Sequence, residues 1–160
     1  MSAYLTYATP MTDTECLLEA IAEMGVPRAE IHHTEIPQML RGWQTDQKAN
    51  IVLRKETTGD RFNDIGFLRT TTGFTAIISN DHPQFGQVWL KEVGLRYSQK
   101  WADKQTRLAE AERQRIAEEK RILVEAQKMA IYEKAKKMGY SVKESKEGDT
   151  VRLVLVKRTY

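Results

Sequence analysis

The pattern of hydrophobic and polar positions is dominated by a helical segment at residues 98–138. This segment contains no glycine or proline and is rich in Ala, Leu, Ile, Glu, Gln, Lys and Arg, which are strong helix formers. At a rise of about 1.5 Å per residue, one helix of this length would extend roughly 60 Å, about twice the diameter of a small domain. We therefore predict a projecting helix with a role in interaction.

Shorter elements are predicted on both sides of this helix. A first helix is expected to begin at Thr12, which would form a capping box with Glu15, and to end at Gly25. The long helix should start near Gln84, with a kink or break possible at Gly94. Period-two alternation and turn residues predict strands at 2–8, 30–35, 48–55, 64–69, 74–79, 140–144 and 151–157.

These elements predict an α+β fold, in which a mainly antiparallel sheet is backed by two helices and the second helix extends into the projection. In this interpretation, residues 1–97 and 139–160 together form one α+β domain. Residues 98–138 form the long helical projection.

Composition narrows the function only slightly. The 160 residues carry a formal net charge of +3, which is too small to indicate a nucleic-acid-binding protein. Cys16 is the only cysteine, so an internal disulfide is excluded, and its place on the apolar face of the first helix favours a core residue. With no targeting segment and no apolar run of about 20 residues, we expect a cytoplasmic protein without a membrane partner.

The projecting helix supplies the main candidate for a binding surface. Its aliphatic edge consists of Leu108, Ile116, Ile122 and Leu123. A heptad seam is incomplete, because Gln105, Glu112 and Glu119 occupy companion positions that a coiled coil would fill with apolar residues. Three interpretations stay open: docking of a partner or of another copy of the chain, a solvated strut, and contact with nucleic acid.

The nucleic-acid alternative depends on the basic residues of the same helix. The candidates for phosphate contacts are Arg107, Arg113, Arg115, Lys120 and Arg121. Glu110, Glu112, Glu118 and Glu119 are interleaved with them. Mixed charge of this kind is typical of a solvated face, which we consider the better interpretation.

A second candidate surface is the group Arg41, Gly42, Trp43 and Gln44. Glycine permits close backbone approach, arginine offers a planar donor fork, and tryptophan offers a large contact area. Arg41, Trp43 and Gln44 are therefore candidate partner-binding residues. The alternative, slightly favoured by the pattern, is a strand entrance with Trp43 packed into the core.

No metal or cofactor site is predicted. His32 and His33 are adjacent, so on a strand they would point to opposite faces and would not bind one metal ion together. The sequence contains no glycine-flanked nucleophile elbow, phosphate-binding P-loop or dinucleotide fingerprint. An enzyme without a recognisable motif is a further alternative.

The order of several short motifs resembles one family. The motifs are Leu40-Arg41-Gly42-Trp43-Gln44, Ala49-Asn50-Ile51-Val52-Leu53-Arg54, Asp64-Ile65-Gly66-Phe67, Leu95-Arg96-Tyr97, Gly139-Tyr140-Ser141-Val142 and Val151-Arg152-Leu153-Val154-Leu155. This order resembles the uncharacterised family of the hypothetical chloroplast open reading frame thirty-five, domain of unknown function 1257. The chain departs from the family pattern by roughly thirty extra residues between Tyr97 and Gly139, close to eight helical turns.

The resemblance implies a domain identity without a known activity or cofactor. It also implies a place in an assembly with an AAA-type ATPase, and the plastid stroma as the location if the gene is plastid-encoded. Together with the residues themselves, it favours a non-catalytic interaction or adaptor module that presents a long helix. A nucleic-acid or ribosome-associated binding protein is the first alternative, and an enzyme is the second.

Overall fold

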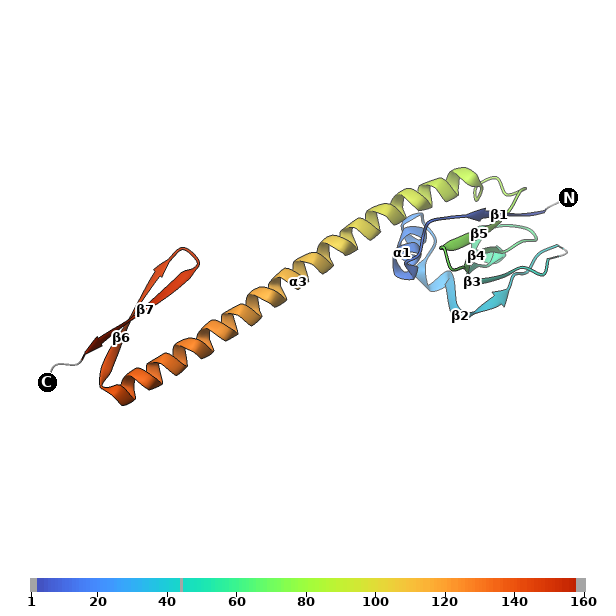
Figure 1. Ribbon diagram of the computed structural model, residues 1–160. Coiled ribbons are helices and arrows are strands. Elements are labelled where there is room, and N and C mark those ends of the chain that lie inside the picture. The colour runs from blue at the N-terminus through green and yellow to red at the C-terminus, as the bar shows by residue number, and fades with distance from the viewer. Residues whose placement is uncertain (1–2, 44, 158–160) are drawn as a thin grey trace. The chain divides into compact units, whose positions relative to one another are not determined.

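The computed structural model describes residues 3–43 and 45–157 and has an α+β fold (Figure 1). The predicted fold class, with an antiparallel sheet and a long second major helix, is confirmed. The elements are β1 (Tyr4–Ala8), α1 (Thr14–Glu23), η1 (Arg28–Glu30), β2 (Ile31–Met39), β3 (Lys48–Leu53), α2 (Lys55–Thr58), β4 (Ile65–Arg69), β5 (Phe74–Ser79), α3 (Gln87–Met138), β6 (Tyr140–Glu147) and β7 (Thr150–Lys157).

Five strands form the main sheet, in the order β1-β5-β4-β3-β2, and every neighbouring pair is antiparallel. In the centre of the sheet, Phe67 lies opposite Ile51 on one side and Ala76 on the other. The pairing of β2 with β3 is interrupted between His33 and Gln38, where the register shifts. The sheet edges are therefore β1 and the irregular strand β2.

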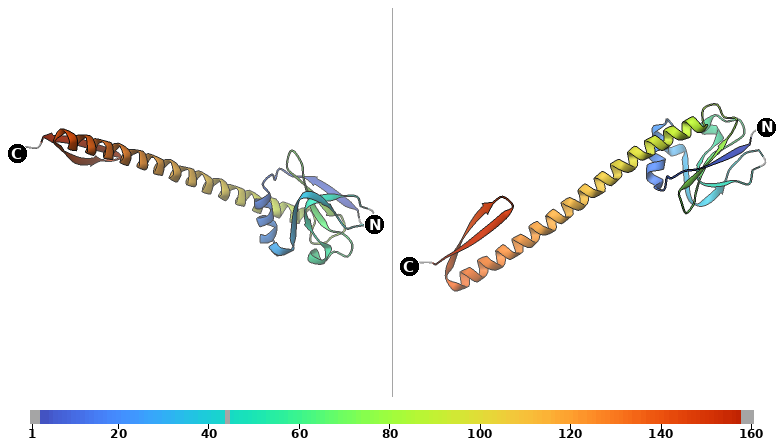
Figure 2. Two further views of the ribbon diagram at one scale, coloured as in Figure 1. Left: turned by 90° about the horizontal axis from the view of Figure 1, so that it is seen from below. Right: turned by 45° about the horizontal axis from the view of Figure 1, so that its top comes forward.

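The main core lies between one face of this sheet and two helices (Figure 2). α1 contributes Leu17 and Ile21, and the first turns of α3 contribute Trp89 and Val93, all buried. The alternation of buried residues along the central strands sends Phe67 into this cluster, where its ring lies 6.2 Å from that of Trp89. A smaller cluster contains Leu40, Ala49, Val52 and Ile77, of which Val52 and Ile77 alternate along their strands with residues of the main core.

The chain divides into two compact units, residues Met1–Gln105 and Thr106–Tyr160, so α3 contributes residues to both. The sequence analysis grouped residues 139–160 with residues 1–97. In the described part of the chain, β6 and β7 instead pair with each other in a separate two-stranded sheet and belong to the second unit. Alternation predicts that a segment is a strand, but it does not encode which strand it pairs with; here the turn at Gly148 favours the local partner.

The long helix begins at Gln87, three residues later than predicted. Just before the helix, the backbone N–H groups of Gln84 and Phe85 both donate to Nδ1 of His82, at 3.1 Å each. These groups are therefore satisfied by a side chain before the hydrogen bonding of the helix begins. The helix then continues through Gly94 without a break.

The predicted capping box at Thr12 is wrong by one residue. Asp13 is the N-cap of α1, and its carboxylate accepts a hydrogen bond of 3.0 Å from the backbone N–H of Cys16. The backbone N–H of Thr12 is held elsewhere, because it donates to the hydroxyl of Tyr97. Cys16 is buried, as its place on the apolar face predicted, and burial raises the pKa of its thiol.

We expect Asp13→Ala to lower the free energy of unfolding by about 0.5–2 kcal/mol, the usual cost of losing an N-cap. Burial would raise the pKa of Asp13, but hydrogen bonds from Lys104 and from Cys16 outweigh burial and hold this pKa below its ordinary value. Because the pKa is lower in the folded state, the contribution of Asp13 is fully present above about pH 4 and disappears as the pH falls through the folded pKa. Urea unfolding at neutral and acidic pH measures both effects.

The matched control is Thr12→Ala, which removes the predicted cap instead of the observed one and should leave stability within about 0.5 kcal/mol of the parent. A larger loss from Thr12→Ala than from Asp13→Ala would contradict the cap assignment.

Candidate interaction surfaces

The second unit exposes a row of aliphatic side chains on α3. The exposed fractions are 54% for Leu108, 52% for Ile116, 56% for Ile122 and 59% for Leu123. At 3.6 residues per turn these four residues project from the same side of the helix. We call them the outer apolar face.

The roughly opposite side of α3 is covered by the β6–β7 hairpin of the same unit. Ala135 is buried there, and Val124 and Lys128 are half-buried. The ammonium of Lys128 hydrogen-bonds the carboxylate of Glu144 on β6, and this bond holds the pKa of Glu144 below and that of Lys128 above its ordinary value. The hairpin thus covers one side of α3 at residues 124–135, and the outer apolar face lies on the other side and is exposed.

Ion pairs within the helix surround and cross the outer apolar face. Arg115 donates to both carboxylate oxygens of Glu112, at 3.0 and 2.6 Å, and to Glu119 one turn later. Arg121 makes a similar double contact with Glu118, at 2.9 and 2.6 Å. The hydrogen bonds from Arg115 and Arg121 lower the pKa of Glu112 and Glu118, respectively.

These pairs bear on the nucleic-acid alternative. Two of its five candidate residues, Arg115 and Arg121, already hold carboxylates. Arg107, Arg113 and Lys120 make no ion pair with the part of the chain that the structure describes. The basic residues therefore do not form a continuous cationic patch, because acidic partners separate them.

The Arg41–Trp43 motif lies in the first unit. The interpretation that placed Trp43 in the core is wrong, because its side chain is 59% exposed. Its backbone N–H donates a 3.2 Å hydrogen bond to Oδ1 of Asn63. The guanidinium of Arg41 lies 3.3 Å from Glu56 at the surface. Gln44, the third candidate residue, lies outside the described residues.

The fixed part of this motif is its backbone. Asp64 is fully buried, and its carboxylate accepts hydrogen bonds of 2.8 Å from the backbone N–H groups of Arg41 and Lys55. It also forms an ion pair with the guanidinium of Arg54 at 2.7 Å. A Cβ at Gly42 would lie 2.7 Å from the Tyr4 ring. The glycine is therefore required by close packing, and the motif residues hold a loop in place.

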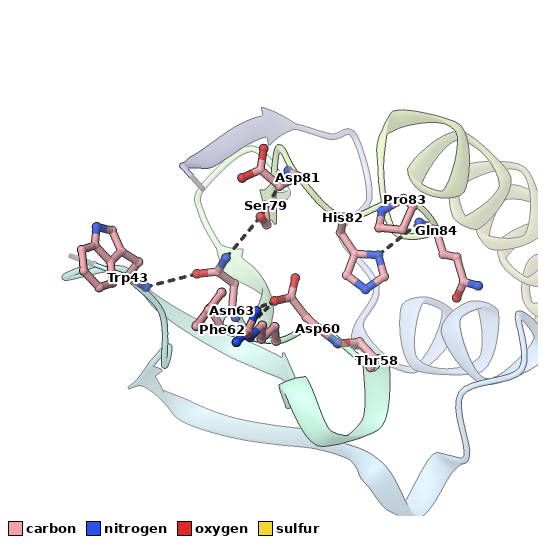
Figure 3. Close-up of a pocket in the computed structure, with 12 residues that line it drawn as sticks. Trp43, Thr58, Asp60, Phe62, Asn63, Ser79, Asp81, His82, Pro83 and Gln84 are labelled. Carbon is pink, nitrogen blue, oxygen red and sulfur yellow. Dashed lines mark hydrogen bonds between the residues drawn. The ribbon is translucent and has the colours of Figure 1, made fainter. Parts of the chain in front are cut away.

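Trp43 stands at the rim of a cavity of about 850 Å³ (Figure 3). Its wall includes Phe62, Asp60 and His82, and its polar floor contains Asn63, whose side-chain amide donates to the hydroxyl of Ser79 at 3.3 Å. The sequence analysis named only Trp43 among these residues as a site candidate. The others come from turns after α2 and β5, where no periodic pattern indicates that they will meet.

A second hollow, of about 1150 Å³, runs along the start of α3 in the same unit. Val88, Leu95 and Trp101 line it from the helix, and residues 7–12 line it from the other side. Val88 and Leu95 are well exposed although they are apolar. This hollow is shaped by the helix and by the chain leading into α1, and it carries little charge.

Neither a metal-binding cluster nor a membrane-spanning helix is present in the described residues. They contain no group of three or more His, Cys, Asp or Glu side chains placed to bind a metal ion. None of their helices combines the length and the apolar composition that crossing a membrane requires.

Comparisons with known proteins find no matching family model, no matching curated protein and no matching solved structure. The fold is therefore established as α+β from the structure alone. The resemblance to the family of the hypothetical chloroplast open reading frame thirty-five stays a prediction.

Proposed function

We propose that the chain is a non-catalytic protein-interaction module and that the outer apolar face of α3 is its binding surface. The observation that carries the proposal is the exposure of Leu108, Ile116, Ile122 and Leu123, on the side of the helix away from the hairpin. Burying one such side chain is worth about 1.5–3 kcal/mol. A partner that covers the face would gain this free energy of burial. In a solvated strut, the aliphatic side chains would stay exposed and gain nothing.

The charges on the face support a protein partner over nucleic acid. Arg115 and Arg121 are held by carboxylates of the same helix, so a phosphate would have to displace Glu112, Glu119 or Glu118. A protein partner can accept these pairs as they stand, because opposite charges fix orientation and discourage wrong partners. The resemblance adds a setting to this proposal, an assembly that contains an AAA-type ATPase.

The proposal is tested with Ile116→Asp combined with Leu123→Asp. Two lost aliphatic contacts correspond to about 3–6 kcal/mol, so we expect complexes to weaken at least about 100-fold. The readout is capture of nuclease-treated complexes from a lysate of the source cells by tagged protein, followed by measurement of their mass. Thermal unfolding of the first unit should be unchanged, because neither residue belongs to it.

The matched control is Gln114→Asp combined with Ala117→Asp. It adds the same two charges to the same helix, but on the side away from the outer apolar face. The control should keep every complex of the parent. If both double variants keep the complexes, the outer apolar face does not bind, and the Arg41–Trp43 loop becomes the surface to test. If binding instead disappears on nuclease treatment, the nucleic-acid alternative replaces the proposal.

A further inference from the structure

We propose that the occupant of the outer apolar face is a second copy of this chain, bound with its α3 antiparallel to the first; this inference rests on the proposed function. The face has a two-fold pattern along the helix. Leu108 and Leu123 lie equally far from the point midway between Arg115 and Ile116, and so do Ala109 and Ile122. An antiparallel pair of helices centred on this point places Leu108 of each copy against Leu123 of the other.

Side-chain size matches across this arrangement. Ile122 of each copy meets Ala109 of the other, so a large side chain faces a small one and the helices can approach closely.

The charged residues at the centre favour the antiparallel orientation. Arg115 of one copy lies nearest to Ile116 of the other and within one turn of that copy's Glu112 and Glu119. Arginine has five N–H donors, and Arg115 uses three on its own helix, which leaves two for the second copy. Glu112 of one copy then faces Glu119 of the other, and the two arginines lie between these acids.

A parallel pair in register lacks this complementarity. It would place each residue against its own copy, so Arg115 would face Arg115. Two arginines directly across an interface oppose association, whereas in the antiparallel pair the facing Glu112 and Glu119 have the two arginines between them. Ile122 would also face Ile122 instead of the small Ala109. The pattern on α3 therefore selects both the partner and its direction.

Cysteine cross-linking tests the orientation in the full chain. Cys16→Ala removes the native thiol, and Leu108→Cys and Leu123→Cys are then introduced into separate proteins. A disulfide requires Cα atoms within about 4.4–6.8 Å. Under mild oxidation, we expect the mixture of the two variants to form a linked dimer, and each variant alone to stay unlinked. Light scattering of the parent should give twice the 18.5 kDa of one chain at high concentration.

Efficient self-linking of Leu108→Cys would show a parallel pair and overturn the proposal. A parent protein that stays at 18.5 kDa at submillimolar concentration would also overturn it. In that second case, a complex with a different protein that is lost in Ile116→Asp/Leu123→Asp would leave the proposed function standing, so failure of the inference and failure of the function are distinguishable. As a control for folding, the Ile116→Asp/Leu123→Asp protein should be monomeric with unchanged unfolding of its first unit.

Discussion

Asp64→Ala should lower the free energy of unfolding of the first unit by about 3–5 kcal/mol, the usual cost of removing one member of a buried ion pair. The Asp64 side chain is fully buried, and that of Arg54 is only 19% exposed. The substitution leaves the Arg54 guanidinium without its carboxylate. It also leaves the backbone N–H groups of Arg41 and Lys55 without acceptors, and each unsatisfied group carries a penalty of its own.

Chemical denaturation followed by circular dichroism measures this loss. Asp46→Ala is the matched control, because Asp46 is an exposed aspartate in the connection between β2 and β3 that contains Arg41, and its removal should change stability by less than about 0.5 kcal/mol. The loop that carries Trp43 should loosen in Asp64→Ala, seen as faster amide exchange at Arg41. A loss below about 1 kcal/mol would show that Asp64 does not hold this loop.

The sequence predicts those parts of the fold that follow from local periodicity. Alternation along 48–55 predicts a strand with Ala49, Ile51 and Leu53 on one face, because a pleated strand sends successive side chains to opposite sides. The strand is observed and Ile51 and Leu53 lie together in the main core, but Ala49 belongs to the smaller cluster. The same alternation does not reveal the role of Asp64. That role depends on Arg54, Arg41 and Lys55 converging from other positions, and no residue spacing encodes such a meeting.

The Arg41–Trp43 loop is a second case in which contacts between distant residues decide the structure, and here the prediction from sequence was wrong. A tryptophan beside a predicted strand is expected in the core, since large aromatic side chains usually bury most of their area. Here the close contact of Gly42 with Tyr4 and the bond from Trp43 to Asn63 fix the loop so that the indole stays outside. Both contacts join residues far apart in sequence, so the cavity at Trp43 could be found only in the structure.

The two C-terminal strands illustrate the difference between predicting an element and predicting the sheet that it joins. Strands at 140–144 and 151–157 are observed as β6 and β7, with β6 extending further than predicted. Their pairing with each other, and not with the five-stranded sheet, depends on the competition between a short turn and a distant edge. Periodicity contains no information about that competition.

Gly73→Ala should lower the free energy of unfolding by about 2–5 kcal/mol, for two reasons that act together. Gly73 has a φ of +144°, where a residue with a side chain is strained by roughly 1–3 kcal/mol. A Cβ there would also lie 2.5 Å from the carbonyl oxygen of Thr9 and 2.9 Å from that of Met11, and overpacking of this kind costs a further 1–3 kcal/mol or so.

The clash cannot be relieved by a side-chain rotation, because both neighbours are backbone atoms. They are held in place by the bonds from Phe74 N–H to Met11 O, at 2.7 Å, and from Thr9 N–H to Phe74 O, at 3.1 Å. The same chemical change at Gly94 provides the control: that glycine is helical and a Cβ there meets no atom within 4 Å, so Gly94→Ala should raise stability by about 0.5–1 kcal/mol. Both variants are measured in one denaturation series. Changes of opposite sign in the free energy of unfolding would show that backbone contacts require glycine at position 73. Small changes of equal size would show that these contacts do not require glycine there.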